Sequence, residues 1–229
     1  MTLPPHHEPG AMLGELRQRH GQHGDLWVFG YASLIWRPEF HATERRPALV
    51  RGWHRALRMR SKINRGTPER PGLVFALLPG GACRGEVFRL RARDAEPEMQ
   101  RLWQREMILP VYTPRWLPCR TSQGDVLALG FTLSRRSEAC TPRLPEAQML
   151  DILRHARGRF GSTLEYLAQT AQALRDRRIR DAEIERLMAL AVRAGLLQAA
   201  PAARSPADSV PLTVPSSTPG SSTVTPQAG

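Results

Sequence analysis

Lysine is almost absent from this 229-residue chain, because Lys62 is the single lysine and the other 32 of the 33 basic residues are arginine. Cysteine is also scarce, with only Cys83, Cys119 and Cys140, and no two of them form a C-x-x-C pair. An odd number of widely spaced cysteines argues against a disulfide framework and against a zinc knuckle. We therefore expect reduced, mostly buried thiols.

Long apolar runs are missing as well. No stretch approaches about 18 consecutive apolar residues, so the sequence predicts no membrane-spanning helix and no membrane partner. Residues 1–20 lack the basic segment followed by an apolar segment that marks a secretory signal. These two absences predict a cytoplasmic protein.

The charge balance is strongly basic, with a formal net charge of +12 at pH 7. A basic surface can bind nucleic acid, or it can simply be a solvated, arginine-rich surface. The arginines are scattered, and the densest runs, at 135–136 and 175–178, are short and contain no aromatic residues for base stacking. The solvated surface is favoured and no nucleic-acid partner is expected, with a basic nucleic-acid-binding β-barrel module as the alternative.

Composition divides the chain into three parts. Residues 1–24 form an N-terminal extension that is rich in Pro, His and Gly at its start. Residues 25–198 contain nearly all the apolar residues that are spaced as in strands or helices, and they are expected to form one folded domain. Residues 199–229 contain Pro, Ser or Thr at 16 of 31 positions and no aromatic residue, which predicts a disordered tail.

Strand patterns fill the first two thirds of the domain, and helical patterns fill the last third. Glycine- and proline-rich turns, such as 79–81, separate short strands expected at 26–30, 49–60, 73–78, 84–90, 116–118 and 126–132. Helices are expected at about 95–108, 147–157, 162–176 and 181–194, where Ser162 with Glu165 forms a capping-box signature and Asp181 is a plausible N-cap. This order predicts an α+β fold with a small mixed, mainly antiparallel β-barrel and flanking helices.

One carboxylate occupies an unusual place in the predicted helix 95–108. Its apolar residues Met99, Leu102, Trp103 and Met107 follow helical spacing, and that spacing places Glu106 on the same side. Two interpretations are open. Glu106 either reaches solvent or an arginine partner, or it faces a partly dry cavity where burial raises its pKa towards the range useful for proton transfer.

A second unusual segment is Leu26–Trp36, in which an apolar strand runs into small residues at Gly30–Ser33. Backbone N–H groups at such a strand end can cradle a carboxylate or a developing oxyanion. The alternative is an ordinary strand and turn with aromatic core residues. Ser33 lacks a G-x-S-x-G context, so a nucleophilic role is not expected. The histidines show no spacing typical of metal ligands, and no metal site is predicted.

Several segments resemble one known family. VFGYASLIWRPEF resembles the N-terminal signature of the ChaC-like gamma-glutamylcyclotransferases, glutathione-specific branch. RGWHRALRM, RGTPERPGLVFALLPGGACRGEVFRL, the pair Arg105–Glu106 with Tyr112, and GSTLEYL from Gly161 follow in the same order. The resemblance covers about residues 27–190, which is nearly the whole predicted domain.

The resemblance implies a small mixed barrel with flanking helices and an enzyme that needs no cofactor. The implied reaction cleaves reduced glutathione to 5-oxoproline and Cys-Gly, with other gamma-glutamyl peptides or amines as alternative substrates. The family's catalytic glutamate corresponds to Glu106. Either Tyr31 or Tyr112 is a candidate for orienting it, and Tyr112 is also expected to contact the substrate. The family's substrate loop corresponds to Gly30, Tyr31, Ala32, Ser33, Leu34 and Ile35.

The loop departs from the family at one position, because Ala32 stands where the family usually has glycine. If the backbone there required a positive φ, alanine would cost about 1 kcal/mol or more. The sequence thus leaves two possibilities, an ordinary backbone region at Ala32 or a strained loop. It makes no prediction of the oligomeric state.

Overall fold

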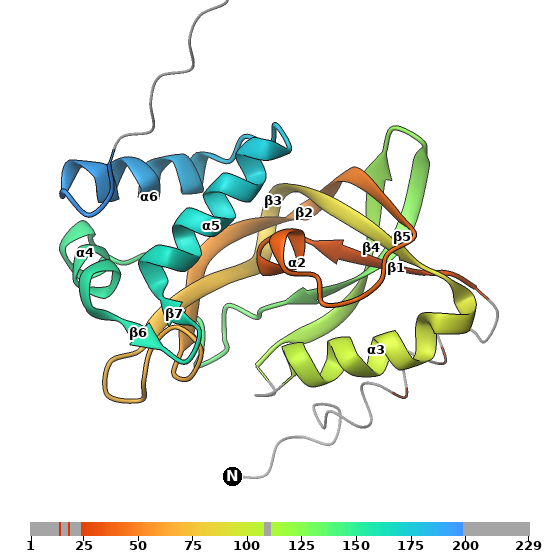
Figure 1. The fold of residues 1–229 in the computed structure, drawn as a ribbon, viewed down its shortest axis with the longest axis horizontal. Helices are drawn as coiled ribbons and strands as arrows, with labels where there is room; N and C mark the ends of the chain where they lie inside the picture. Colours follow the sequence, from red (N-terminus) through yellow and green to blue (C-terminus); the bar gives the residue numbers. More distant parts are fainter. Residues whose placement is uncertain (1–13, 15–17, 19–23, 108–110, 199–229) are drawn as a thin grey trace, which may run out of the picture. The chain divides into compact units, whose positions relative to one another are not determined.

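The computed structural model describes residues 24–107 and 111–198, together with Gly14 and Gln18 (Figure 1). The predicted N-terminal extension therefore lies almost wholly outside the described residues, and the predicted tail at 199–229 lies entirely outside them. Within the described part, no helix is long and apolar enough to cross a membrane.

Five strands close into a barrel in the spatial order β1-β3-β2-β4-β5. Neighbouring strands are antiparallel, except that β5 also pairs in parallel with β1 and β3. The predicted mixed, mainly antiparallel barrel is therefore confirmed. The strands are β1 (Leu26–Gly30), β2 (Glu44–Ser61), β3 (Gly72–Leu90), β4 (Thr113–Thr121) and β5 (Gly124–Thr132).

Strand β3 is one continuous element of 19 residues, whereas the sequence predicted two strands separated by a turn at 79–81. Gly80 and Gly81 do adopt positive φ, at 101° and 73°, but they bend the ladder without ending it. Their partner β2 shifts register between Arg51 and Trp53, around Gly52 at φ 81°, so the irregularity is shared by both strands. A bulge can preserve strand pairing that a turn would terminate, and local sequence does not distinguish the two.

The helices lie on two sides of the barrel (Figure 1). They are α2 (Ser33–Trp36), α3 (Ala92–Glu106), α4 (Glu146–His155), α5 (Thr163–Asp176) and α6 (Ala182–Arg193), and a small hairpin of β6 (Arg157–Gly158) and β7 (Gly161–Ser162) precedes α5. The four-residue helix α2 was missed by the sequence analysis, which treated that stretch as a loop.

Local capping signals decide where two helices begin. Ser162 Oγ accepts the Glu165 N–H at 3.0 Å while the Glu165 carboxylate accepts the Ser162 N–H at 2.8 Å, which confirms the capping box of α5. Asp181 accepts the Ile184 N–H at 3.1 Å at the start of α6. Helix α3 begins at Ala92, three residues earlier than predicted, because its N–H is bound by the distant Asp25 carboxylate at 2.8 Å.

The core extends from the barrel interior into the α4–α6 layer. Phe29, Leu57, Phe75 and Leu77 fill the barrel with almost no exposure, and Leu167 of α5 joins the same cluster. Burying a side chain of this size contributes about 1.5–3 kcal/mol. Helix α3 packs separately on β1, through the predicted stripe of Met99, Leu102, Trp103 and Met107 against Leu26 and Val28.

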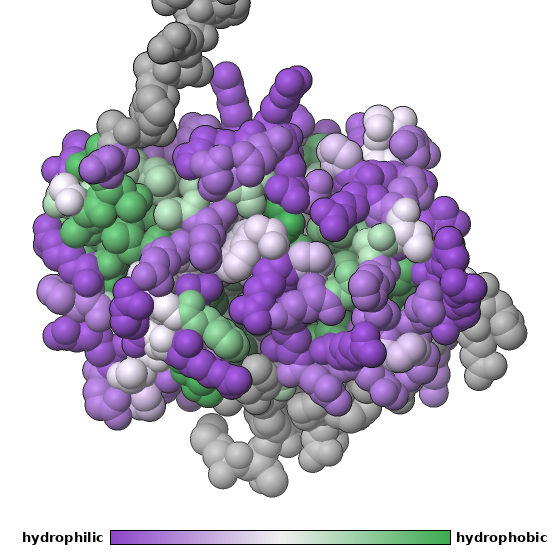
Figure 2. Space-filling view, in the orientation of Figure 1, coloured by the Kyte–Doolittle hydropathy of each residue, from purple (hydrophilic) through white to green (hydrophobic). Residues whose placement is uncertain are grey.

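Part of the arginine content is structural. Arg55 is only 3% exposed, forms an ion pair with Asp181 and donates to the Tyr31 and Arg84 carbonyl oxygens. Arg177, the residue that follows α5, likewise forms an ion pair with Glu86 of β3 at 2.7 Å. Hydrophilic side chains cover most of the face seen in Figure 2. Some of the arginines thus stabilise the fold through buried or half-buried ion pairs and hydrogen bonds, and the others contribute to the surface charge.

Removing residues 199–229 is expected to leave the thermal midpoint of unfolding within about 1–2 °C of the full chain, because the segment offers few apolar side chains to pack. Differential scanning calorimetry of both proteins measures this. A fall of several degrees would show that the segment docks on the domain.

Candidate active site

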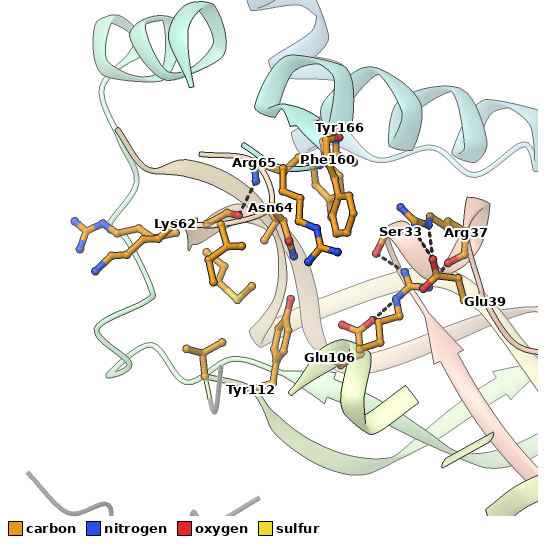
Figure 3. A pocket seen from close by; sticks show the side chains of 18 of the residues that line it. Ser33, Arg37, Glu39, Lys62, Asn64, Arg65, Glu106, Tyr112, Phe160 and Tyr166 are labelled. Carbon is orange, nitrogen blue, oxygen red and sulfur yellow. Dashed lines mark hydrogen bonds and ion pairs between the residues drawn. The ribbon is translucent and has the colours of Figure 1, made fainter. Parts of the chain in front are cut away.

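A cavity of about 330 Å³ opens between the C-terminal end of α3, helix α2 and the segment after β2. This volume lies in the range of about 300–1,000 Å³ typical of small-molecule sites. In Figure 3, Glu106 and Tyr112 face the cavity from one side and Arg65, Phe160 and Tyr166 from the other. The lining is rich in charge and aromatic surface.

Glu106 is the last residue of α3, and its side chain is 14% exposed. Its Oε1 lies 3.0 Å from Arg105 Nε. Burial raises the pKa of the Glu106 carboxyl, Arg105 opposes that rise by attraction and hydrogen bonding, and Glu39 adds a smaller rise. Both sequence interpretations therefore hold in part, because the carboxylate has an arginine partner and also faces a cavity that favours its protonated form.

Arg105 connects this carboxylate to the opposite wall. Its Nη2 donates to Ser33 Oγ at 3.3 Å, and its Nη1 contacts Glu39 Oε2 and the Pro38 carbonyl oxygen, both at 3.1 Å. It also donates to the Arg37 carbonyl oxygen. One guanidinium thus fixes Glu106 relative to α2 and the turn after it.

The predicted substrate loop reaches the cavity at one side chain, that of Ser33. Leu34 and Ile35 are buried in the core, and the Ile35 N–H is bound to the Ala32 carbonyl oxygen at 2.9 Å. A Cβ on Gly30 would lie 2.7 Å from Phe88 Cε2, so this glycine is needed for packing against β3. Substrate contacts of all six loop residues, Ser33 included, stay a prediction.

The loop is held firmly in place. Arg55 donates to the Tyr31 carbonyl oxygen at 2.5 Å, and Arg177 donates to that of Ile35 at 2.9 Å. At the end of α2, Trp36 Nε1 donates to Thr170 Oγ1 at 3.2 Å. Ser33 therefore stands on a preorganised segment, as a binding site requires.

Ala32 has φ −143°, outside the left-handed region that favours glycine. The positive φ that would have strained alanine is therefore absent, while the ψ of −113° lies outside the common α and β regions. The backbone at this position does not require glycine.

Ala32→Gly is therefore expected to lower the free energy of unfolding by about 0.4–1 kcal/mol, since it relieves no positive-φ strain and increases unfolded-state entropy. Urea denaturation of the variant and the parent protein measures the difference. A more stable glycine variant would show that alanine is strained at this position.

The hydroxyls of Tyr31, which is buried, and Tyr112, which is half-buried, lie close to each other and to Glu106. They hydrogen-bond to each other, and Tyr31 also donates to the Phe131 carbonyl oxygen at 3.1 Å. Burial raises the pKa of both phenols well above the usual value, and the nearby Glu106 charge raises it further. Both hydroxyls are thus protonated at neutral pH. Tyr112 lines the cavity, whereas Tyr31 lies behind it.

Periodicity and spacing did not single out the rest of the lining. Arg65 and Tyr166 lie in the quoted segments RGTPERPG and GSTLEYL, so the family resemblance was the available signal for them. Lys62 was conspicuous as the single lysine but had no assigned place. Trp36 ends the segment Leu26–Trp36 that the sequence analysis singled out, whereas Phe160 had no local signal because only tertiary contacts bring it here.

The cavity chemistry is that of an acid–base site with a surplus of cations. Within the described ranges, no group of three or more His, Cys, Asp or Glu side chains has the geometry of a metal site. Six basic residues and two carboxylates line the cavity, namely Arg37, Arg60, Lys62, Arg65, Arg105 and Arg159 with Glu39 and Glu106. The site is suited to an anionic small molecule that exchanges a proton with Glu106.

Comparisons with known proteins agree with one another. The family model described as ChaC-like protein matches residues 26–194. A glutathione-specific gamma-glutamylcyclotransferase of Escherichia coli is 36% identical over 158 residues, which is 66% of this chain and 66% of that protein. The chain thus spans about two thirds of that relative's length. A protein with the same name from Schizosaccharomyces pombe is 33% identical over 172 residues, covering 66% of this chain and 84% of that protein.

The fold has a solved counterpart. The crystal structure of a glutathione-specific gamma-glutamyl cyclotransferase from yeast superposes with a TM-score of 0.67 at 22% sequence identity, covering 75% of this chain and 97% of that one. Since the identity is low, this similarity supports the barrel architecture alone.

Proposed function

Because this chain belongs to the ChaC-like protein family, we infer that it is a glutathione-specific gamma-glutamylcyclotransferase. It converts reduced glutathione to 5-oxoproline and Cys-Gly. The observation that supports the assignment most directly is the carboxylate of Glu106, which lies in a cavity of suitable size where burial raises its pKa.

The reaction is an intramolecular aminolysis. The α-amine of the gamma-glutamyl group attacks its own γ-carbonyl carbon, a new C–N bond closes the five-membered ring, and the C–N bond to cysteine breaks. The amine and the carbonyl carbon belong to the same substrate molecule, so the enzyme chiefly has to hold the substrate in the conformation that brings these two groups together. At neutral pH the amine is mostly an ammonium ion, which cannot attack.

We assign the proton transfers to Glu106. The ammonium nitrogen loses two protons as it becomes the lactam N–H, and the cysteinyl nitrogen gains two as it leaves as an ammonium group. The Glu106 carboxylate relays these protons one at a time and is ionised again at the end, so the proton balance closes on one residue. A raised pKa suits both steps, because a base and an acid work best when their pKa is close to the working pH. Neither step needs a cofactor.

Neighbouring groups have supporting roles in this proposal. Arg105 holds the Glu106 carboxylate in place, and Ser33 with its loop is the proposed contact for the gamma-glutamyl half of the substrate. Tyr31 donates its own proton to the Phe131 carbonyl oxygen, so the Tyr112 hydroxyl has to turn away from Tyr31 before it can donate to the oxyanion that develops on the γ-carbonyl. The surplus of basic residues complements glutathione, which has two carboxylates and one ammonium group at neutral pH.

The deciding experiment incubates the protein with reduced glutathione and measures 5-oxoproline and Cys-Gly by mass spectrometry. Equal amounts of the two products are expected, with oxidised glutathione and gamma-glutamylalanine as comparison substrates. Release of 5-oxoproline from gamma-glutamylalanine and not from glutathione would favour the alternative, a cyclotransferase for other gamma-glutamyl compounds. No product from any substrate would overturn the enzymatic assignment.

We propose the cytoplasm as the compartment. Cys83, Cys119 and Cys140 are all unpaired, as suits a reducing environment that also supplies reduced glutathione. Burial raises the pKa of Cys119 to about 12, so this thiol is unreactive at neutral pH.

A further inference from the structure

Five of the six cations that line the cavity fall into two groups, and the sixth, Arg60, donates to the Glu138 carbonyl oxygen. Near Glu106, Arg37 and Arg105 are both paired with Glu39, and Arg105 also holds Glu106 itself. The other group comprises Lys62, Arg65 and Arg159, which we call the cationic end of the cavity. None of these three forms an ion pair with a carboxylate in the part of the chain that the structure describes.

Arg65 is the buried member of the cationic end, with 6% exposure. Its Nη1 donates to the Phe160 carbonyl oxygen at 2.5 Å, and its guanidinium lies 5.1 Å from the centre of the Tyr166 ring. These contacts orient the group into the cavity (Figure 3), and neither supplies a negative charge. Glu165 attracts Arg65 without forming an ion pair with it, and the Glu165 carboxylate is already paired with Arg157 at 2.7 Å. The buried guanidinium therefore has no direct counter-ion, and this arrangement suits a site that an anion completes.

Lys62 and Arg159 flank Arg65 on two segments that are tied together. The Arg159 N–H donates to the Ile63 carbonyl oxygen at 2.8 Å, and the Phe160 N–H donates to that of Asn64 at 2.9 Å. Gly158 allows this close approach, because a Cβ there would lie 2.5 Å from the Ile63 carbonyl oxygen. The exposed side chains of Lys62 and Arg159 thus share a rigid rim next to Arg65.

The charges of glutathione can be matched to these two groups. The reacting α-amine must reach Glu106, and the α-carboxylate is attached to the same carbon atom, so both belong near the paired cations. The glycine carboxylate is at the opposite end of the tripeptide. In Figure 3, Lys62 is directed away from Glu106, and Arg65 lies between them.

We propose that the cationic end of the cavity binds the glycine carboxylate of the substrate, with Arg65 as the main contact. The inference rests on the proposed function and names the part of the leaving group that the site recognises. A guanidinium can bind a carboxylate through two parallel N–H groups, which adds directionality to the charge attraction. The enzyme accordingly selects gamma-glutamyl substrates that end in a free carboxylate at tripeptide length.

Equilibrium binding to the Glu106→Gln protein, which we expect not to turn substrate over, tests the proposal. Calorimetry compares reduced glutathione with its glycine monoethyl ester, which lacks only the charge in question. We expect the ester to bind at least tenfold more weakly, which corresponds to about 1.4 kcal/mol. The same pair of ligands is then titrated into double variants that also carry Arg65→Gln, Lys62→Gln or Arg159→Gln.

The expected result is that Arg65→Gln weakens glutathione binding and reduces the acid-to-ester preference to less than threefold, with smaller reductions for Lys62→Gln and Arg159→Gln. Arg154→Gln, an exposed arginine of α4 outside the cavity, is the control and should keep the full preference. If Arg65→Gln does not fold, Arg65→Lys and the two rim variants, whose side chains are exposed, carry the comparison.

The proposal is overturned if the ester binds as tightly as the acid, or if all cationic-end variants keep the preference of the parent protein. Failure of the proposed function gives a different result, because it would appear as absence of 5-oxoproline from the wild-type protein. A preserved acid-to-ester preference without turnover would retain the carboxylate site and reject the cyclotransferase activity.

Discussion

Glu106→Gln is expected to abolish turnover while leaving the fold intact. Glutamine keeps the shape of the side chain and can still accept a hydrogen bond from Arg105, but it cannot take the proton of the substrate ammonium group. Loss of a general base typically costs about 10²–10⁴-fold in rate, and here the same group also protonates the leaving amine. Release of 5-oxoproline from glutathione, followed by mass spectrometry, measures the loss.

Stability should change in the opposite direction from activity. Burial raises the pKa of Glu106 in the folded protein above its unfolded value, so the folded state holds this proton more tightly. Its contribution to stability is therefore full below the unfolded pKa and is lost as the pH rises through the folded pKa. At neutral pH the buried carboxylate opposes folding, and the neutral glutamine removes that penalty.

The thermal midpoint of Glu106→Gln at pH 7–8 should accordingly equal or exceed that of the wild-type protein. Circular dichroism of both proteins over a pH series provides the control that separates lost chemistry from lost structure. A folded glutamine variant with near wild-type product release would refute the catalytic assignment.

The position of Glu106 shows how far the sequence alone could go. Helical spacing placed it on the apolar stripe of α3, and the structure confirms burial of Met99, Leu102, Trp103 and Met107. The stripe could not show whether the carboxylate met a partner or a cavity. Deciding that required Arg105 and Glu39, and the contact with Glu39 joins residues 66 positions apart.

The barrel was predictable because its strands either alternate apolar and polar residues or are apolar throughout, and because turn residues bound them. The continuity of β3 could not be predicted, because glycine pairs such as Gly80 and Gly81 occur both in turns and in bulges. Long-range contacts were also beyond reach. Asp25 extends α3 by binding the Ala92 N–H, and the Phe160 carbonyl oxygen orients Arg65 across 95 positions of sequence.

The second large effect is expected at Arg105, which acts through Glu106 as a positioning residue. Its charge and hydrogen bond lower the pKa of the Glu106 carboxyl against the larger effect of burial. Removing the charge by Arg105→Gln should therefore raise that pKa further. The ionised base would then be lost at a higher pH, so the acidic limb of the kcat/KM profile should move towards alkaline pH.

Arg105→Gln should also lower kcat, because the contacts to Ser33 and Glu39 that fix the end of α3 are lost. Misplacement of a reacting group by about 1 Å can cost on the order of 10²-fold in rate. The two effects are separable with Arg105→Lys, which keeps the charge but not the planar fork. In Arg105→Lys, the acidic limb of the kcat/KM profile should stay close to its wild-type pH, while kcat should still fall.

Arg101→Gln is the matched control, since Arg101 lies on the same helix, is 66% exposed and contacts Glu98 outside the cavity. It should keep the wild-type pH profile and rate. Steady-state kinetics with reduced glutathione between pH 5 and 9 measures all three variants. If Arg105→Gln left the acidic limb in place or moved it towards lower pH, the ion pair with Arg105 would not govern Glu106 and another group would have to set its charge. If the limb moved equally in Arg101→Gln, the shift would reflect the net charge of the helix and not the contact between Arg105 and Glu106.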